Sequence, residues 1–160
     1  MNDGPDASPA ESVDAIASTL NQLIQTCKAG ECGFSAAAGA VQDPNLRRLF
    51  ESYSQQRAEF AAELQLEIER MAEEPVDTGD PAAALHPSWI DIKAGAGGQD
   101  EGTIISECER GEDKALASYQ KALESGLPGD VRLIVERQFL QVRQAHDQVR
   151  SLEEVHTRHG

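Results

Sequence analysis

The sequence predicts an all-α protein, an antiparallel four-helix bundle with a long crossover between its second and third helices. Apolar residues recur at intervals of three and four along four long stretches, which is the pattern of amphipathic helices. No long run of alternating β-branched residues is present. Aromatic residues make up only 4% of the 160-residue chain, so its core depends on Leu, Ile, Val and Ala, and this composition favours helices.

The first two stretches are expected to form neighbouring helices. The first begins near Val13 and stops at Asp43-Pro44, because proline disfavours helix at the preceding residue and suits the first turn of the next helix. The second runs from Leu46 to Met71. Such a short join predicts that the two helices are antiparallel neighbours.

The last two stretches form a second expected pair. The third runs from Ile104 to Leu123, and a Gly- and Pro-rich segment, residues 125–129, stops it. The fourth follows from Val131 to Leu152. The join between the second and third stretches is long enough to return along the bundle, which gives one crossover.

Three segments complete the expected organisation. Residues 81–94 within the crossover predict a short extra helix. Residues 1–10 are small, polar and Pro-containing, so we expect a disordered lead-in before a bundle of residues 11–155. Residues 156–160 are expected to form a frayed tail.

Charge and cysteine content narrow the expected partners and location. The 28 acidic and 14 basic residues give a net charge of -14, which repels phosphate backbones and anionic membranes, so neither nucleic acid nor membrane is an expected partner. The first ten residues lack a basic region and an apolar run, so we expect no signal peptide. With three cysteines, an odd number, the sequence predicts reduced thiols and a cytoplasmic protein.

Polar residues interrupt the apolar stripes of all four helices. Glu31, Arg57, Glu112 and His146 each lie where the helical spacing demands an inward apolar residue, and Arg143 lies at the edge of its stripe. We therefore predict that these five residues form a paired polar cluster at the centre of the bundle. By contrast, a ladder of glutamates on the second helix predicts a solvated face: Glu51, Glu59, Glu63 and Glu67.

Two of these helices carry the same short pattern. Cys27-x-x-Gly30-Glu31 resembles the run from Cys108 to Glu112, and both glutamates interrupt their stripes. The halves of the chain are thus interpreted as a degenerate internal repeat. The alternative is that two unrelated amphipathic helices share a five-residue match by chance.

Longer runs resemble known proteins. Gly30-Glu31, Leu49-Phe50 ahead of Arg57, and His146 with its neighbours resemble the ferritin-like superfamily, rubrerythrins included. The runs LIQTCKAGECGF, SQQRAEFAAEL, HPSWIDIKA, ECERGEDKAL and QAHDQVRSL more closely resemble a bacterial domain-of-unknown-function family of rubrerythrin-related bundles, over residues 13–153. The resemblance implies a four-helix bundle and no particular activity.

The superfamily's di-iron site uses one Glu from each of two helices and a Glu-x-x-His from each of the others. Glu31 and Glu112 match the single glutamates and His146 matches one histidine, but Arg57 and Arg143 stand where the motif needs Glu. Arginine stays protonated and cannot bind a metal. We therefore expect a metal-free core without a cofactor; the alternative is one iron or manganese ion on Glu31, Glu112 and His146.

Three functions from different classes follow from this sequence. The first is a structural or interaction protein, not an enzyme, that works through its surface as a homodimer or with another protein. The second is a metal-binding or oxidative-stress protein. The third is a thiol-based redox sensor using Cys32, since Cys27 and Cys108 fall on apolar stripes and are expected to pack as small apolar groups.

Overall fold

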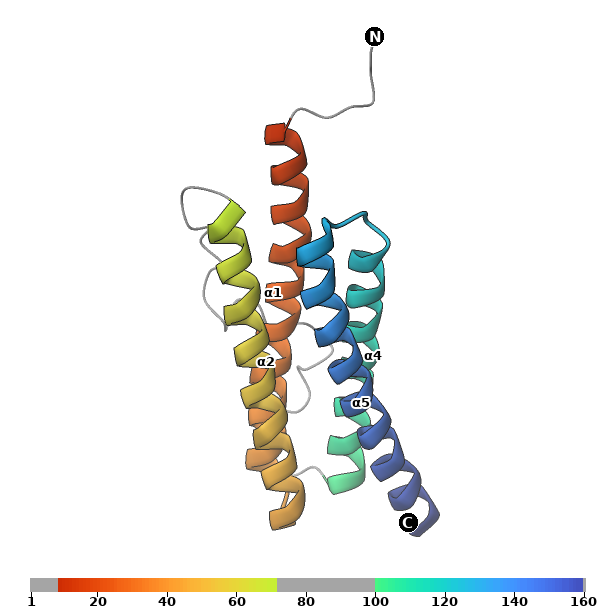
Figure 1. Ribbon diagram of the computed structural model, residues 1–160. Coiled ribbons are helices and arrows are strands. Elements are labelled where there is room, and N and C mark those ends of the chain that lie inside the picture. The colour runs from red at the N-terminus through yellow and green to blue at the C-terminus, as the bar shows by residue number, and fades with distance from the viewer. Residues whose placement is uncertain (1–8, 72–99, 160) are drawn as a thin grey trace.

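Four long helices make up the part of the chain that the computed structural model describes, residues 9–71 and 100–159 (Figure 1). They are α1 (Pro9–Ala40), α2 (Pro44–Met71), α4 (Glu101–Leu123) and α5 (Gly129–His159), and no strand occurs among the described residues. The predicted all-helical, four-helix bundle is therefore confirmed. The sequence sets residues 1–10 and 156–160 apart from the bundle. The structure has α1 beginning at Pro9 and α5 ending at His159, so helix extends into both of these segments.

The order and direction of the helices match the expected connections. α1 and α2 run antiparallel, as do α4 and α5, while α2 and α4 point the same way (Figure 1). The start of α4 lies beside the turn between α1 and α2. There, Glu101 Oε2 accepts hydrogen bonds from the backbone N–H groups of Gln42 at 3.1 Å and Asp43 at 3.0 Å. The end of α2 and the start of α4 therefore lie at opposite ends of the bundle. The predicted extra helix at 81–94 lies outside the described residues.

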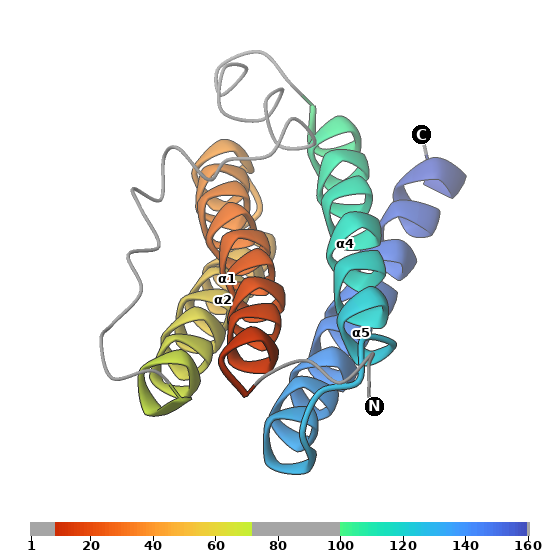
Figure 2. The same ribbon diagram turned by 90° about the horizontal axis from the view of Figure 1, so that it is seen from above.

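Viewed along its axis, the bundle consists of two helix pairs (Figure 2). α1 packs on α2, α4 packs on α5, and α1 also packs on α4. α2 and α5 approach each other less closely, and polar side chains bridge them. Arg137 of α5 pairs with Glu63 of α2, and Gln56 lies 3.5 Å from Gln141.

The helix ends follow the local signals in the sequence. Pro44 opens α2, where its missing N–H costs nothing. Asp100 caps α4, because its side chain accepts the backbone N–H of Thr103 at 2.7 Å. After α4, Gly126 adopts a φ of 80°, a left-handed conformation that glycine reaches without steric cost, and the chain reverses into α5.

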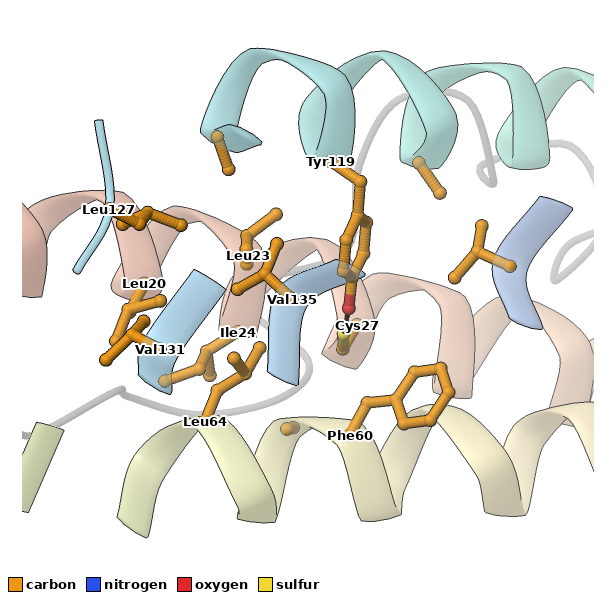
Figure 3. Close-up of a cluster of buried hydrophobic side chains, with 14 of the residues drawn as sticks. Leu20, Leu23, Ile24, Cys27, Phe60, Leu64, Tyr119, Leu127, Val131 and Val135 are labelled. Atoms are coloured by element: carbon orange, nitrogen blue, oxygen red, sulfur yellow. Dashed lines mark hydrogen bonds between the residues drawn. The ribbon is translucent and has the colours of Figure 1, made fainter. Parts of the chain in front are cut away.

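The core divides into two apolar clusters along the bundle. One cluster lies at the end of the bundle that contains the turn between α4 and α5. Its buried residues include Leu20, Ile24, Leu64 and Val135 (Figure 3). The other fills the opposite end, around Phe34 and Phe50 among others. Deep burial of these side chains follows from the predicted stripes, and it supplies most of the driving force for folding. None of the described helices is both long enough and apolar enough to span a membrane.

Candidate functional site

A fully buried ion pair joins α2 to α4 in the interior. Arg57 Nη1 donates to Glu112 Oε1 at 2.6 Å, and Nη2 donates to Oε2 at 2.7 Å. The side chain of Arg57 is 2% exposed and that of Glu112 is 0% exposed. Two parallel hydrogen bonds between opposite charges give this contact both strength and a fixed geometry.

The surroundings of Arg57 hold its side chain in place. Its guanidinium lies 5.4 Å from the centre of the Phe34 ring, a favourable cation–π contact, and its Nε donates to Gln56 Oε1 at 3.2 Å. Gly30 of α1 faces it: a Cβ there would lie 3.3 Å from both Cγ and Nη1 of Arg57. The glycine of the repeated motif thus makes room for the arginine.

Electrostatics keep this pair charged. Burial by itself favours loss of the proton from Arg57, because a charged group is poorly solvated in the interior. The negative charge and hydrogen bonds of Glu112 outweigh burial, so the pKa of Arg57 is raised above its usual value. The pair is therefore a neutral unit made of two ions, and no further counter-ion is needed.

Only part of the predicted five-residue cluster forms. Arg57 and Glu112 meet as expected, whereas Glu31 is half-buried and its backbone carbonyl accepts a hydrogen bond from Ser54 Oγ at 2.8 Å. Arg143 is exposed, so its predicted place in the cluster is wrong. It follows the buried Val142 by one residue, about 100° around the helix, which turns it toward solvent.

His146 is buried, but its partners are not those of the central pair. Its Nε2 lies 2.7 Å from Asp113 Oδ1 on α4, and its Nδ1 lies 3.2 Å from Asp147 Oδ1. His146 therefore pairs with Asp113 and Asp147, which corrects its predicted place in the cluster with Glu112. Asp113 follows Glu112 directly, so it leaves α4 on a different side from the ion pair.

A second buried polar network runs from α1 through α4 to α5. Tyr119 Oη donates to Gln138 Oε1 at 2.7 Å. It also lies 3.1 Å from Cys27 Sγ (Figure 3). Since the phenol has one proton, the Cys27 thiol is the donor to Tyr119. Gln138 Nε2 continues the network by donating to Glu63 Oε1 at 2.8 Å.

Sequence reasoning missed two members of the polar interior. Gln138 is fully buried between Val135 and Val142, at the spacing that marks a stripe, so the rule that identified Glu112 applies to it as well.

Glu67 is 4% exposed and pairs with Arg70 at 3.0 Å, which corrects its predicted place on a solvated ladder. Of the other glutamates in the predicted ladder, Glu51 and Glu59 are exposed and Glu63 is half-buried.

The thiols differ in accessibility. Cys27 and Cys108 are buried in the two apolar clusters, as their stripe positions predicted, and Cys32 is half-buried. Burial raises the pKa of Cys27 to about 11, although the nearby positive charge of Arg57 lowers it. Burial likewise raises the pKa of Cys108. Both thiols are protonated at neutral pH and are therefore poor nucleophiles.

The residues present do not fit a di-iron centre. Both carboxylate oxygens of Glu112 are bound by Arg57, and both ring nitrogens of His146 are bound by aspartates. The set Glu31, Glu112 and His146 therefore does not offer three free donors to one ion. In residues 9–71 and 100–159, no three or more His, Cys, Asp or Glu side chains gather in a way that could hold a metal.

These features define an all-helical bundle protein with an ion-paired interior. Residues 15–125 match the family described as a domain of unknown function, DUF2383, so the chain belongs to this family. The match includes most of α1 and all of α2 and α4, and hence both members of the buried pair. No curated protein matches the chain.

Proposed function

We propose that this chain is a ferritin-like bundle that acts as a structural or interaction protein, without an enzymatic centre. The observation that carries the proposal is the buried bidentate pair of Arg57 and Glu112. In metal-binding ferritin-like bundles, inward carboxylates and histidines hold the ions. Here an inward carboxylate is neutralised by a guanidinium, which cannot be a ligand.

The ferritin-like assignment is supported by the helix connections. α2 ends at one end of the bundle, and α4 begins at the other (Figure 1). One crossover between two antiparallel pairs is the arrangement of ferritin-like folds.

We also propose that the protein acts through its surface and that its partner is a second copy of this chain. Leu133 and Leu140 of α5 are 67% and 57% exposed. They are seven residues apart and lie within about 20° of each other around the helix. Two exposed leucines on one helical face make a candidate contact for a homodimer.

Metal analysis tests the proposal directly. Protein is purified without chelator from cells grown with iron and manganese, and bound metal is measured by plasma mass spectrometry. We expect well under one metal ion per chain, and a Tm that neither EDTA nor added Fe²⁺ or Mn²⁺ changes. Stoichiometric iron or manganese that raises the Tm would overturn the proposal and support the metal-binding alternative.

A matched pair of variants sharpens this test. Arg57→Glu replaces the cation by a second inward carboxylate, and Arg48→Glu makes the same change at an exposed site on the same helix. The first variant is expected to lose stability without metal and to regain part of it with Mn²⁺, because a divalent ion can then neutralise two carboxylates. The second variant is expected to respond as the wild type does.

A further inference from the structure

The solvent-facing side of α5 carries apolar residues at a seven-residue spacing. Leu133 and Leu140 are 67% and 57% exposed, and they lie within about 20° of each other around the helix. Val135 and Val142 have the same spacing on the opposite side of the helix, where they are buried in the core. α5 therefore presents one apolar stripe to the bundle and a second, shorter one to solvent.

Two opposite charges follow the exposed leucines at a fixed distance. Glu136 comes three residues after Leu133, and Arg143 comes three residues after Leu140. Both charged residues therefore lie on the same flank of the exposed stripe, where helices that pair with each other form ion pairs. The other flank of the stripe carries uncharged side chains: Ile134, Gln141 and Gln148.

Both flanking charges are accessible to a partner. Arg143 is exposed, and within residues 9–71 and 100–159 no carboxylate forms an ion pair with it. The side chain of Glu136 is 42% exposed, and its Oε2 accepts from Arg132 Nε at 2.9 Å. A carboxylate has two acceptor oxygens, so Glu136 can bind a second arginine.

The charge of this part of α5 permits contact between two copies. The whole chain has a net charge of -14, so two copies repel each other in general. The arginine between the two leucines, Arg137, pairs with Glu63 of α2 and is neutralised within its own chain. Residues 130–147 are balanced, with three acidic side chains against three arginines: Asp130, Glu136 and Asp147 against Arg132, Arg137 and Arg143.

We propose that the α5 helices of two copies pair antiparallel across a two-fold axis near Leu140, with Glu136 of each copy facing Arg143 of the other. This geometry specifies the contact of the homodimer proposed above and rests on that dimer. The midpoint between Glu136 and Arg143 falls between Phe139 and Leu140. The axis that pairs the charges therefore also brings the two Leu140 side chains together. Such a two-fold contact is closed, because both copies use the same surface.

The placement of the charges favours antiparallel over parallel pairing. In a parallel pair, the flank with Glu136 and Arg143 would face the opposite flank of the partner, which is uncharged at residues 134, 141 and 148. In an antiparallel pair related by a two-fold axis, each flank faces the same flank of the partner. The antiparallel pair therefore forms the ion pair between Glu136 and Arg143, and forms it twice.

Charge reversal and its restoration test this pairing. Glu136→Lys and Arg143→Glu each place like charges against each other across the contact, which weakens association. Sedimentation equilibrium should show a dimer Kd raised about tenfold or more for each single variant, and a Kd near that of the wild type for the variant with both changes. The same charge changes at exposed α2 positions, Glu59→Lys and Arg48→Glu, should leave the Kd close to that of the wild type. Urea unfolding midpoints show whether each variant is folded.

Cysteine cross-linking tests the direction of the pairing independently. Antiparallel pairing about this axis brings the two copies of residue 140 together, but it holds the two copies of residue 133 about 20 Å apart. Under mild oxidation, Leu140→Cys should form a covalent dimer well above the wild-type baseline, and Leu133→Cys should not. Equal cross-linking of the two variants would overturn the antiparallel geometry.

The oligomeric state of the wild type separates this contact from the dimer itself. A wild type that stays monomeric at high micromolar concentration would overturn both the homodimer and the α5 pairing. A dimeric wild type whose Kd responds to the α5 charge reversals no more than to the α2 changes would overturn the α5 pairing alone.

Discussion

Replacing Arg57 by alanine is expected to be among the most damaging single changes in this protein. The change leaves Glu112, which is 0% exposed, as a buried carboxylate without its counter-charge. Breaking a buried ion pair by removing one partner costs about 3–5 kcal/mol. For a chain of this size, that loss lowers the Tm by roughly 6–20 °C.

The assay is urea unfolding followed by far-UV circular dichroism, with Arg48→Ala as the control. Arg48 lies on the same helix and is exposed, with its Nη2 donating to Asn45 Oδ1, so its removal should change the stability by less than about 0.5 kcal/mol. The Arg57→Ala defect should also be smaller at pH 5 than at pH 8, because an uncharged carboxylic acid costs less to bury than a carboxylate.

Removing both charges separates the cost of breaking the pair from its net value. Arg57→Met combined with Glu112→Leu replaces two ions by apolar groups, which in buried sites is often neutral or stabilising. We expect the double variant to be far more stable than Arg57→Ala. If Arg57→Ala costs no more than Arg48→Ala, or if the double variant is as unstable as the single one, the assigned burial and pairing of Glu112 are wrong.

Two further predictions concern packing and assembly. Gly30→Ala should destabilise by about 1–2 kcal/mol, because its new methyl group would press on a guanidinium held by two hydrogen bonds. Gly39→Ala meets nothing within 4 Å and should be neutral or stabilising by up to about 1 kcal/mol, so equal urea midpoints for the two variants would contradict this packing. Light scattering should show a homodimer that Leu133→Gln with Leu140→Gln converts to monomer, and a wild type that is monomeric at high micromolar concentration would refute the dimer.

Much of the candidate site could be predicted from helical spacing. The inward positions of Arg57 and Glu112 follow from their places on two stripes, and their opposite charges made pairing the expected result. The same reasoning applied to Gln138 would have found the second network, since it too stands between buried valines. The prediction for Arg143 is wrong because this residue lies one step off its stripe, and a step of one residue turns the side chain by about 100°, here toward solvent.

The sequence by itself determined the four helices, their approximate ends and the direction in which each inward side chain leaves its helix, because these depend on spacing and on local Pro, Gly and Asp signals. Only the tertiary structure decided which groups meet. The partner of Arg57 lies 55 residues away on α4, and His146 pairs with Asp113 across α4 and α5. Such pairings depend on how far each helix is rotated and shifted against its neighbour. A one-residue step turns a side chain by about 100°, so small differences in helix placement change its partner.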